Sequence, residues 1–305
     1  MRPRHSDATD GLVVAVDRGR YTCHVDGRRI VAIRARELGR RSVVVGDRVA
    51  LVGDTSGQPD ALARIVRIEE RASVLMRTAD DDESAVEGRT ERVVVANADQ
   101  LVIVSALADP PPRTGFIDRC LVAAYDADIE PVLCLTKADL APPDAVLGYY
   151  AELDLPYVLC RPDRPLTALQ EVLAGRMSVL FGHSGVGKST LVNRLIPDAD
   201  RAVGEVGATG RGRHTSSSVV ALPLLATDDG WLIDTPGVRS FGLAHVSANS
   251  LLHGFPDLVE ASVNCPPNCD HTGTAGDCGL DALVAAGKAD ARRLASFRRL
   301  LASTS

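Results

Sequence analysis

The stretch Gly182–Thr190, GHSGVGKST, determines how the rest of the chain is interpreted. It satisfies the phosphate-loop pattern G-x-x-x-x-G-K-[ST], whose fixed positions fall at Gly182, Gly187, Lys188 and Ser189. The apolar run at 177–181 predicts a buried strand entering the loop, and the spacing at 189–195 predicts a helix leaving it. The stretch therefore predicts a nucleotide-binding α/β domain.

Each part of this loop has a role toward phosphate. Glycines let backbone N–H groups turn inward around phosphate oxygens, and the N-terminus of the following helix adds partial positive charge. Lys188 is expected to reach the β- and γ-phosphates, and the hydroxyl of Ser189 to bind Mg²⁺. The predicted nucleotide contacts are Gly182, His183, Ser184, Gly185, Val186, Gly187, Lys188, Ser189 and Thr190.

A second motif, Thr136-Lys137-Ala138-Asp139, follows an expected strand at 131–135. A strand followed by [NT]-K-x-D is typical of guanine recognition. The aspartate accepts hydrogen bonds from the ring N–H and the exocyclic amine, and the lysine stem packs along the ring. Most GTPases have asparagine where this chain has Thr136, so we expect lower guanine affinity, with specificity retained through Asp139. All four residues are predicted to bind GTP.

A third motif, Asp234-Thr235-Pro236-Gly237, follows an expected strand at 230–233. Asp234 is expected to bind Mg²⁺ through water, and the backbone N–H of Gly237 to sense the γ-phosphate. The guanine motif usually comes last in a GTPase, but here it comes first, so the sequence predicts a circularly permuted G domain. Strands alternating with helices from residue 100 onward predict a parallel sheet with helices on both faces.

The segment 204–218, between the phosphate loop and the third motif, is polar and glycine-rich, as in a switch that orders on nucleotide. Thr215 or Ser216 is the expected second hydroxyl ligand of Mg²⁺. Arg213 and His214 are candidates for phosphate or partner contacts, or for a solvated surface. Val238 stands where a water-orienting glutamine is common, so intrinsic hydrolysis should be slow and depend on a partner. The predicted catalytic residues are Lys188, Ser189, Thr215, Asp234 and Gly237.

Near the C-terminus lies the spacing Cys265-x₃-Cys269-x-His271-x₆-Cys278. Three thiolates and an imidazole within fourteen residues predict a Cys₃His zinc site; loosely placed buried thiols are the alternative. Four protein ligands close the coordination sphere, so the zinc is expected to be structural. A helix expected at 290–301 carries Arg292, Arg293, Arg298 and Arg299, a candidate edge facing RNA.

From Gly11 to about Ile68 the sequence has the pattern of short strands bounded by turns, which predicts a small β-barrel. Nine arginines against four acids between Asp17 and Arg48 favour RNA binding over a merely solvated rim, with Tyr21 as the one aromatic for base stacking. The polar segment 76–92 is expected to be a mobile linker or a loop between domains.

Composition sets the remaining bounds. The 305 residues are enough for two or three domains, and 45% hydrophobic residues suit a buried core. No apolar run is as long as a membrane span, and the N-terminus lacks the apolar core of a signal peptide, so we expect a cytoplasmic protein, without membrane contact and monomeric. The net charge of −6 carries no global signature of nucleic-acid binding, so basic surfaces must be local.

Together, the basic barrel, the order TKAD, GHSGVGKST and DTPG, the segment GRGRHTSSS and the Cys₃His tail resemble the small-ribosomal-subunit-dependent GTPases of the RsgA/YjeQ family. The resemblance covers nearly the whole chain. It implies an OB-type barrel at 1–72, a permuted GTPase domain at 73–245 and a small helical zinc domain at 246–305. The chain departs from the family at Thr136, at the serines of the switch and, by about one residue, in the zinc spacings.

The resemblance also implies a function. Members bind the maturing small ribosomal subunit and its rRNA, hydrolyse GTP to GDP slowly alone and faster on the subunit, and assist late assembly. Three other readings stay open on the sequence. They are a P-loop ATPase or small-molecule kinase with Asp139 incidental, an RNA-binding zinc protein with a vestigial nucleotide site, and a permuted GTPase of the large subunit.

Overall fold

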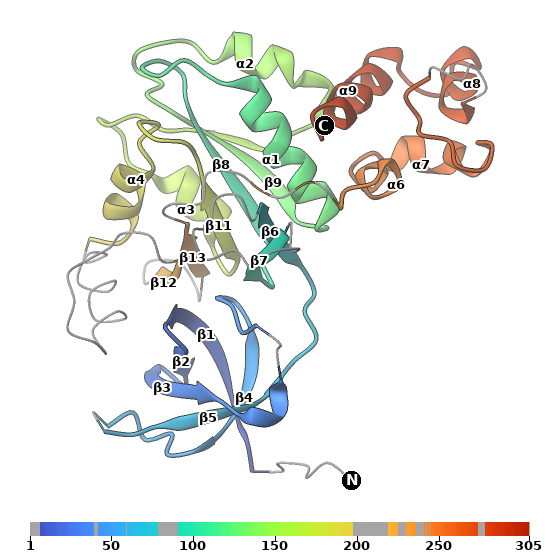
Figure 1. Cartoon of the computed structure of the whole chain (residues 1–305). Helices are drawn as coiled ribbons and strands as arrows, with labels where there is room; N and C mark the ends of the chain where they lie inside the picture. Colours follow the sequence, from blue (N-terminus) through green and yellow to red (C-terminus); the bar gives the residue numbers. More distant parts are fainter. Residues whose placement is uncertain are drawn as a thin grey trace.

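The computed structural model contains a β-barrel, a central α/β layer and a group of C-terminal helices (Figure 1). It describes residues 7–39, 42–58, 60–78, 91–197, 219–224, 230–235, 241, 243, 245–273 and 278–304. The barrel, in blue, lies at one end of the molecule, and the C-terminal helices, in orange and red, lie to the side of the central layer, next to α1.

Five strands form the barrel: β1 (Thr9–Asp17), β2 (Arg20–Val25), β3 (Arg28–Arg34), β4 (Arg48–Gly53) and β5 (Ala63–Ile68). They run in the order β1-β2-β3-β5-β4, and pairing of β1 with β4 closes the barrel. A short 3₁₀ helix, η1 (Arg36–Leu38), follows β3. Val13, Cys23, Ile30, Leu51 and Ile65 fill the interior and are fully buried. The predicted small barrel is confirmed.

One expectation for the barrel is wrong. Tyr21 was expected to offer a ring for base stacking, but its side chain is only 7% exposed and packs in the barrel core. Tyr21, Cys23 and Val25 alternate along β2 and share its buried face. The barrel therefore does not present this aromatic ring to RNA.

The central layer is a mostly parallel sheet in the order β10-β9-β8-β11-β13-β12. Its strands are β8 (Gln100–Ala106), β9 (Glu130–Thr136), β10 (Tyr157–Leu159), β11 (Met177–Phe181), β12 (Val220–Leu224) and β13 (Gly230–Asp234). β12 runs antiparallel to β13, and the other neighbours in this layer are parallel. The predicted alternation of strands and helices is confirmed.

Helices cover both faces of this sheet, so successive residues of a strand enter different cores. Leu101 and Ile103 of β8 pack with α1 (Thr114–Asp126), whereas Val102 and Val104 pack with α3 (Thr167–Leu173) and α4 (Lys188–Leu195). Two short helices, α2 (Asp144–Tyr149) and the 3₁₀ helix η3 (Ala151–Leu153), connect β9 to β10.

A hairpin of β6 (Val74–Thr78) and β7 (Glu91–Ala96) lies between barrel and sheet. The segment 76–92 was expected to be a linker. Its two ends instead belong to these strands, and 79–90 lie outside the described residues. Gly46 of the barrel contacts this hairpin directly: its φ is +89°, and a Cβ on it would lie 1.9 Å from the carbonyl oxygen of Ala96. The barrel and the central layer also share one strand pairing, β1 with β12 at Ala15 and Val220.

The C-terminal region consists of short helices, α6 (Ala248–Leu251), η4 (Leu252–Gly254), α7 (Pro256–Ser262), α8 (Gly279–Ala285) and α9 (Ala291–Ala302). Phe255 and Phe297 are fully buried and belong to the same core as Ile117 and Leu121 of α1. Among the described residues, no helix is long and apolar enough to cross a membrane.

Candidate functional site

The phosphate-loop stretch has the predicted strand–loop–helix form. β11 ends at Phe181, and α4 begins at Lys188 directly after Gly187. Gly187 has a φ of +91°, which L side chains rarely adopt, and a Cβ on Gly182 would lie 2.7 Å from the carbonyl oxygen of Val104. Both glycines are therefore required by the backbone of the loop itself.

The lysine of the loop lies against the aspartate of the third motif. Lys188 Nζ is 3.2 Å from Asp234 Oδ1 and 3.5 Å from the backbone oxygen of Thr235. This geometry arises because β11 and β13 are parallel neighbours, so both residues lie at the carboxyl edge of the sheet. Asp234 Oδ1 is buried and has no hydrogen-bond partner among the described residues. An ammonium and a carboxylate with spare capacity thus lie side by side at the end of the phosphate loop, as the predicted contacts to phosphate and Mg²⁺ require.

The guanine motif is joined to the phosphate loop by Thr136. Its hydroxyl oxygen lies 2.6 Å from the backbone oxygen of Val186, to which it donates a hydrogen bond, and the side chain is 5% exposed. The same side chain lies beneath Gly187, 3.8 Å from where a Cβ would be. Threonine in place of asparagine therefore still forms a hydrogen bond between the guanine motif and the phosphate loop.

The rest of the guanine motif is accessible. Lys137 has a φ of 54°, and its ammonium donates to the backbone oxygen of Asp109. The N–H of Ala138 donates to the carbonyl of Cys160 over 3.3 Å, which fixes the turn. Asp139 is exposed. Asp163, and to a smaller extent Asp139, raise the pKa of Arg161 nearby.

Several predicted residues lie outside the described part of the chain. These are Thr215 and Gly237 of the catalytic set, together with Arg213, His214, Ser216 and Val238. Their roles stay predictions.

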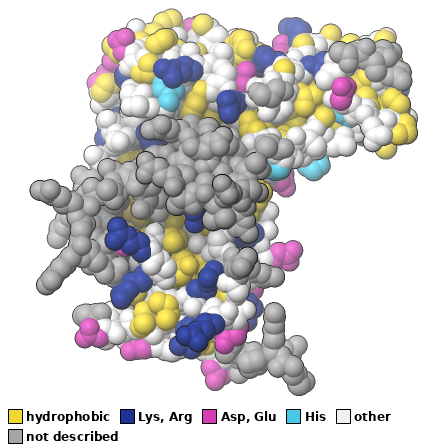
Figure 2. Space-filling view, in the orientation of Figure 1, with side chains coloured by type: hydrophobic (Ala, Val, Ile, Leu, Met, Phe, Trp, Pro, Cys, Tyr) yellow, Lys and Arg dark blue, Asp and Glu magenta, His cyan; other side chains and the backbone are white. Residues whose placement is uncertain are grey.

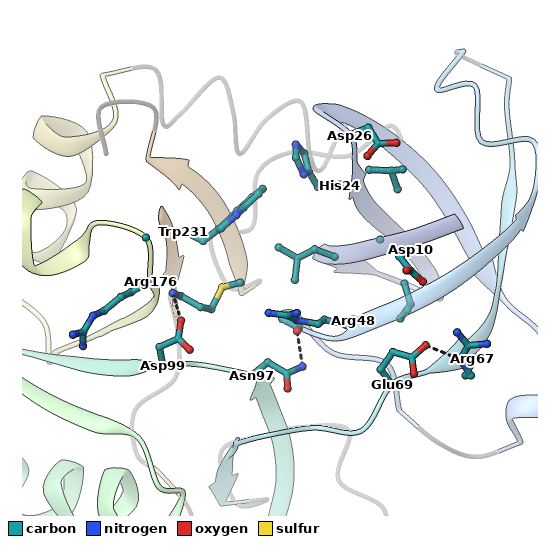
Figure 3. A pocket seen from close by; sticks show the side chains of 17 residues that line it. Asp10, His24, Asp26, Arg48, Arg67, Glu69, Asn97, Asp99, Arg176 and Trp231 are labelled. Atoms are coloured by element: carbon teal, nitrogen blue, oxygen red, sulfur yellow. Dashed lines mark hydrogen bonds and ion pairs between the residues drawn. The ribbon is translucent and has the colours of Figure 1, made fainter. Parts of the chain in front are cut away.

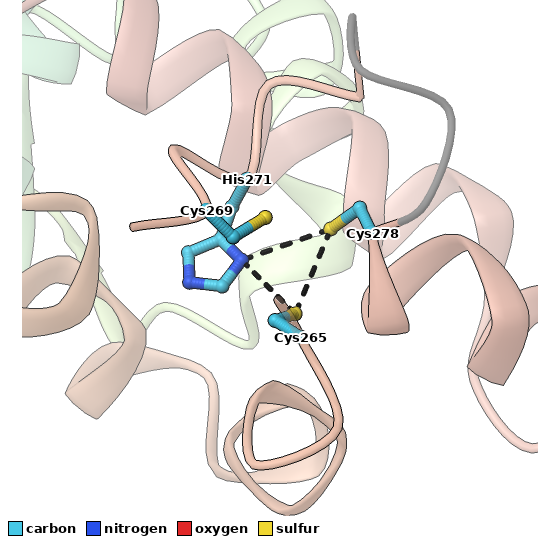
Figure 4. Close-up of side chains that lie close together, drawn as sticks. All are labelled: Cys265, Cys269, His271 and Cys278. Carbon is cyan, nitrogen blue, oxygen red and sulfur yellow. Dashed lines mark hydrogen bonds between the residues drawn. The ribbon is translucent and has the colours of Figure 1, made fainter. Parts of the chain in front are cut away.

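The four predicted metal ligands converge (Figure 4). The ligand atoms of Cys265, Cys269, His271 and Cys278 all lie within 4.8 Å of one another. The Sγ of Cys265 is 3.5 Å from His271 Nδ1 and 4.0 Å from the Sγ of Cys278, which is 3.7 Å from Nδ1. Zinc bonds of about 2.3 Å to sulfur and about 2.0 Å to nitrogen give tetrahedron edges of roughly 3.5–3.8 Å. The cluster therefore fits a zinc ion.

Neighbouring groups prepare the cluster for a metal. His271 Nε2 faces Asn249 Oδ1 at 3.1 Å, which leaves Nδ1 as the ligand, and burial lowers the pKa of the imidazole. Burial raises the pKa of the Cys265 thiol to about 11, while the N–H of Gly279 donates to its sulfur. A bound cation replaces the proton on such a thiol. Asn249 was not found from the sequence, since no spacing links it to the cysteines.

The arginines of α9, predicted as an edge that faces RNA, make contacts within the protein. All four have protein partners: Arg292 with Asp290 and Glu152, Arg293 with Asp257 and Glu152, Arg298 with Asp281, and Arg299 with Asp118 and Tyr149. Arg292 is the most exposed of them, with 73% of its side chain accessible. These arginines mainly hold the C-terminal helices in place.

Comparison with known proteins identifies the family. The family model described as RsgA GTPase matches residues 68–244, more than half of the chain. The small ribosomal subunit biogenesis GTPase RsgA of Chlorobaculum parvum is 33% identical over 98% of this chain and 99% of its own length. The chain belongs to the RsgA GTPase family. An RsgA of Alcanivorax borkumensis is 38% identical over 85% of this chain and 72% of its own.

Solved structures agree on the fold of an RsgA GTPase. YjeQ from Thermotoga maritima superposes with a TM-score of 0.67 at 23% identity, covering 97% of this chain and 98% of its own. YloQ, described as a circularly permuted GTPase, has a TM-score of 0.67 at 22% identity, covering 99% and 97%. The predicted architecture of barrel, permuted α/β GTPase domain and Cys₃His region is thereby confirmed.

Proposed function

We propose that this protein is a GTPase that binds the small ribosomal subunit and assists its late maturation. The main support is the hydrogen bond between Thr136 and Val186, which connects the guanine motif to the phosphate loop. The relatives of this chain are small-subunit biogenesis GTPases. An ATPase has no use for Asp139 at this position, and a vestigial site has no reason to keep Lys188 paired with Asp234.

In this proposal the chain's own residues divide the work on GTP. Thr136, Lys137, Ala138 and Asp139 hold the guanine, with Asp139 accepting two hydrogen bonds from its edge. The backbone of 182–190 surrounds the phosphates, and Lys188 leaves Asp234 to contact the β- and γ-phosphates. Gly237 contacts the γ-phosphate through its N–H. Ser189, Thr215 and Asp234 hold Mg²⁺, which offsets the charge that develops on the phosphates.

The metal of the Cys₃His cluster has a structural role in the proposal. Four protein ligands leave no open position for a substrate. Zinc joins the loop at 265–271 to the start of α8, and so fixes the C-terminal helices.

The proposed partner is the rRNA of the small subunit, contacted by the barrel. Figure 2 shows Lys and Arg side chains, in dark blue, gathered over the barrel. The exposed arginines there are Arg18, Arg20, Arg28, Arg34, Arg36, Arg48, Arg64 and Arg67. The proposal includes a cytoplasmic monomer, with domains at 1–72, 73–245 and 246–305. These boundaries are supported by β5 ending at Ile68, β6 starting at Val74 and α6 starting at Ala248.

Phosphate release from GTP and from ATP, with and without purified small ribosomal subunits, tests the proposal. Slow GTP turnover that the subunits raise strongly, with none from ATP, is expected. Lys188→Ala should abolish the stimulated turnover. Lys288→Ala should not change it, because Lys288 is exposed and lies in the turn between α8 and α9. Turnover indifferent to the subunits would contradict the partner, and a preference for ATP would contradict guanine recognition.

A further inference from the structure

A cavity lies between the barrel and the central sheet, apart from the phosphate loop (Figure 3). Its volume of about 630 Å³ falls in the range of roughly 300–1,000 Å³ typical of ligand pockets, which often lie between domains. Met177 and Trp231, at the amino ends of β11 and β13, form one wall. The phosphate loop follows the carboxyl end of β11, so this cavity lies at the opposite edge of the sheet.

The floor of the cavity is rigid. Gly46 lies so close to Ala96 that no side chain fits between them. The amide of Asn97 is bonded at both ends: its Nδ2 donates to the carbonyl of Gly46, and its Oδ1 accepts from the N–H of Ala72, each over 2.9 Å. A ligand therefore meets a pre-formed site rather than one it must assemble.

An aromatic pair stands at one side of this cavity. Trp231 is the only tryptophan of the chain, is partly exposed, and points toward the barrel. His24 of β2 approaches it from the barrel, with ring centroids 5.0 Å apart and planes at 69°. Among the described residues nothing accepts a hydrogen bond from the indole N–H. A partly exposed indole in a polar cavity is a stacking surface for a planar ring.

The charges of the cavity suit one phosphate rather than a row of them. Of its three arginines, Arg67 is paired with Glu69 and Arg176 with Glu130. Arg48 is exposed, and among the described residues its guanidinium has no ion pair or hydrogen bond. Figure 3 shows Arg48 between the two domains, where it would repel a cationic side chain.

The free acceptors of the cavity are carboxylates. Asp10 and Asp26 line it from β1 and from the turn after β2, and neither has a partner among the described residues. The third aspartate of the lining, Asp99, already accepts a hydrogen bond from the N–H of Met177 over 2.7 Å. A carboxylate accepts readily from an exocyclic amino group of a base.

We propose that this cavity binds one unstacked nucleotide of single-stranded RNA, separately from the GTP site. The base stacks on Trp231, its phosphate pairs with Arg48, and Asp10 and Asp26 accept hydrogen bonds from the amino group of the base. Adenine, cytosine and guanine carry such an amino group, and uracil does not. The site therefore prefers amino-bearing bases over uracil.

The single tryptophan makes the site directly observable. The full-length protein is saturated with GDP and Mg²⁺, so that the GTP site, to which β13 also leads, makes no contribution. Tetranucleotides of adenosine, cytidine or uridine are then titrated while tryptophan fluorescence is recorded. Adenosine and cytidine tetramers are expected to quench it and to bind at least fivefold more tightly than the uridine tetramer. No quenching by any of them, or equal quenching by all three, overturns the proposal.

Variants locate the binding within the cavity. With a labelled adenosine tetramer, Trp231→Ala should weaken binding roughly five- to hundredfold, the effect of losing one base–aromatic stack, and Trp231→Phe should retain most of the affinity. Arg48→Ala should weaken binding and reduce the slope of log affinity against log salt by about 0.7, the value for one phosphate of a single strand.

Arg64→Ala is the matched control, because Arg64 is an exposed arginine of the same barrel that does not line the cavity. Its losses of affinity and of salt slope should be clearly smaller than those of Arg48→Ala. Equal losses for Arg48→Ala and Arg64→Ala would mean diffuse binding over the barrel and would overturn the proposal. So would quenching by an oligo-arginine peptide with none by RNA, which would indicate a basic-peptide site.

Discussion

The hydroxyl of Thr136 donates to the carbonyl of Val186 over 2.6 Å, so the guanine motif and the phosphate loop are parts of one hydrogen-bonded unit. Asparagine, the commoner residue here, has a longer side chain and an amide in place of a hydroxyl. Threonine satisfies the buried carbonyl directly from the end of β9. The bond therefore orders the two halves of the nucleotide site before any nucleotide arrives.

Thr136→Val should uncouple the two halves. It keeps the shape of the side chain but leaves the carbonyl of Val186 without its donor, at a cost of about 1–3 kcal/mol. We expect weaker binding of a fluorescent GDP analogue and a lower melting temperature. Thr136→Ser retains the hydroxyl and should restore both. Identical behaviour of the two variants would show that the hydroxyl is not used.

Gly46→Ala should be among the most damaging single methyl additions in the chain. The new Cβ would lie 1.9 Å from the oxygen of Ala96, so backbone must move. Gly19→Ala is the control, since Gly19 has a similar φ of +83° and nothing within 4 Å. Gly19→Ala should lower the free energy of unfolding by only about 1–2 kcal/mol, the cost of placing alanine in a left-handed backbone conformation. The difference between the thermal unfolding midpoints of the two variants measures the destabilisation caused by the clash. Equal midpoints would contradict the clash.

Arg293→Ala should loosen the C-terminal helices from the central layer. Its guanidinium donates to Asp257 over 2.7 Å and to the backbone oxygen of Glu152 over 2.6 Å, with only 18% of the side chain exposed. Loss of this guanidinium is expected to lower the free energy of unfolding by about 2 kcal/mol, mostly because its acceptors on Asp257 and Glu152 are left without a donor. Arg292→Ala, at an exposed neighbour, should cost less than about 1 kcal/mol. Denaturant unfolding separates the two, and equal losses would contradict this role for Arg293.

Zinc should be present in one equivalent and should leave in acid. Protons compete with the metal for His271 and the three thiolates, so affinity falls as the pH falls. Elemental analysis after dialysis at pH 7 and pH 5 measures this. Cys278→Ser should lose the zinc, whereas Cys23→Ser, at a buried thiol of the barrel, should keep it. Full zinc content in Cys278→Ser would remove Cys278 from the ligand set.

The parts of this protein that local chemistry dictates could be predicted from its sequence. The loop 182–190 needs its glycines for its own backbone, and four clustered ligands leave few alternatives to a metal. The wrong predictions concern which face of a strand a side chain occupies and which distant residues an arginine contacts. Tyr21 was expected to offer a ring for base stacking, although its alternation with Cys23 and Val25 indicates the core face. The partners of Arg293 are supplied by distant segments, so no local pattern reveals them.

Phe255 and Phe297, beside the zinc cluster, share one core with Ile117 of the GTPase layer. The C-terminal helices are therefore not an appendage that can unfold alone. Any ligand that binds only the folded state shifts the whole folding equilibrium, and a metal held by four residues is such a ligand. We therefore expect the abundance of the folded protein in the cell to follow the supply of the metal that this cluster binds.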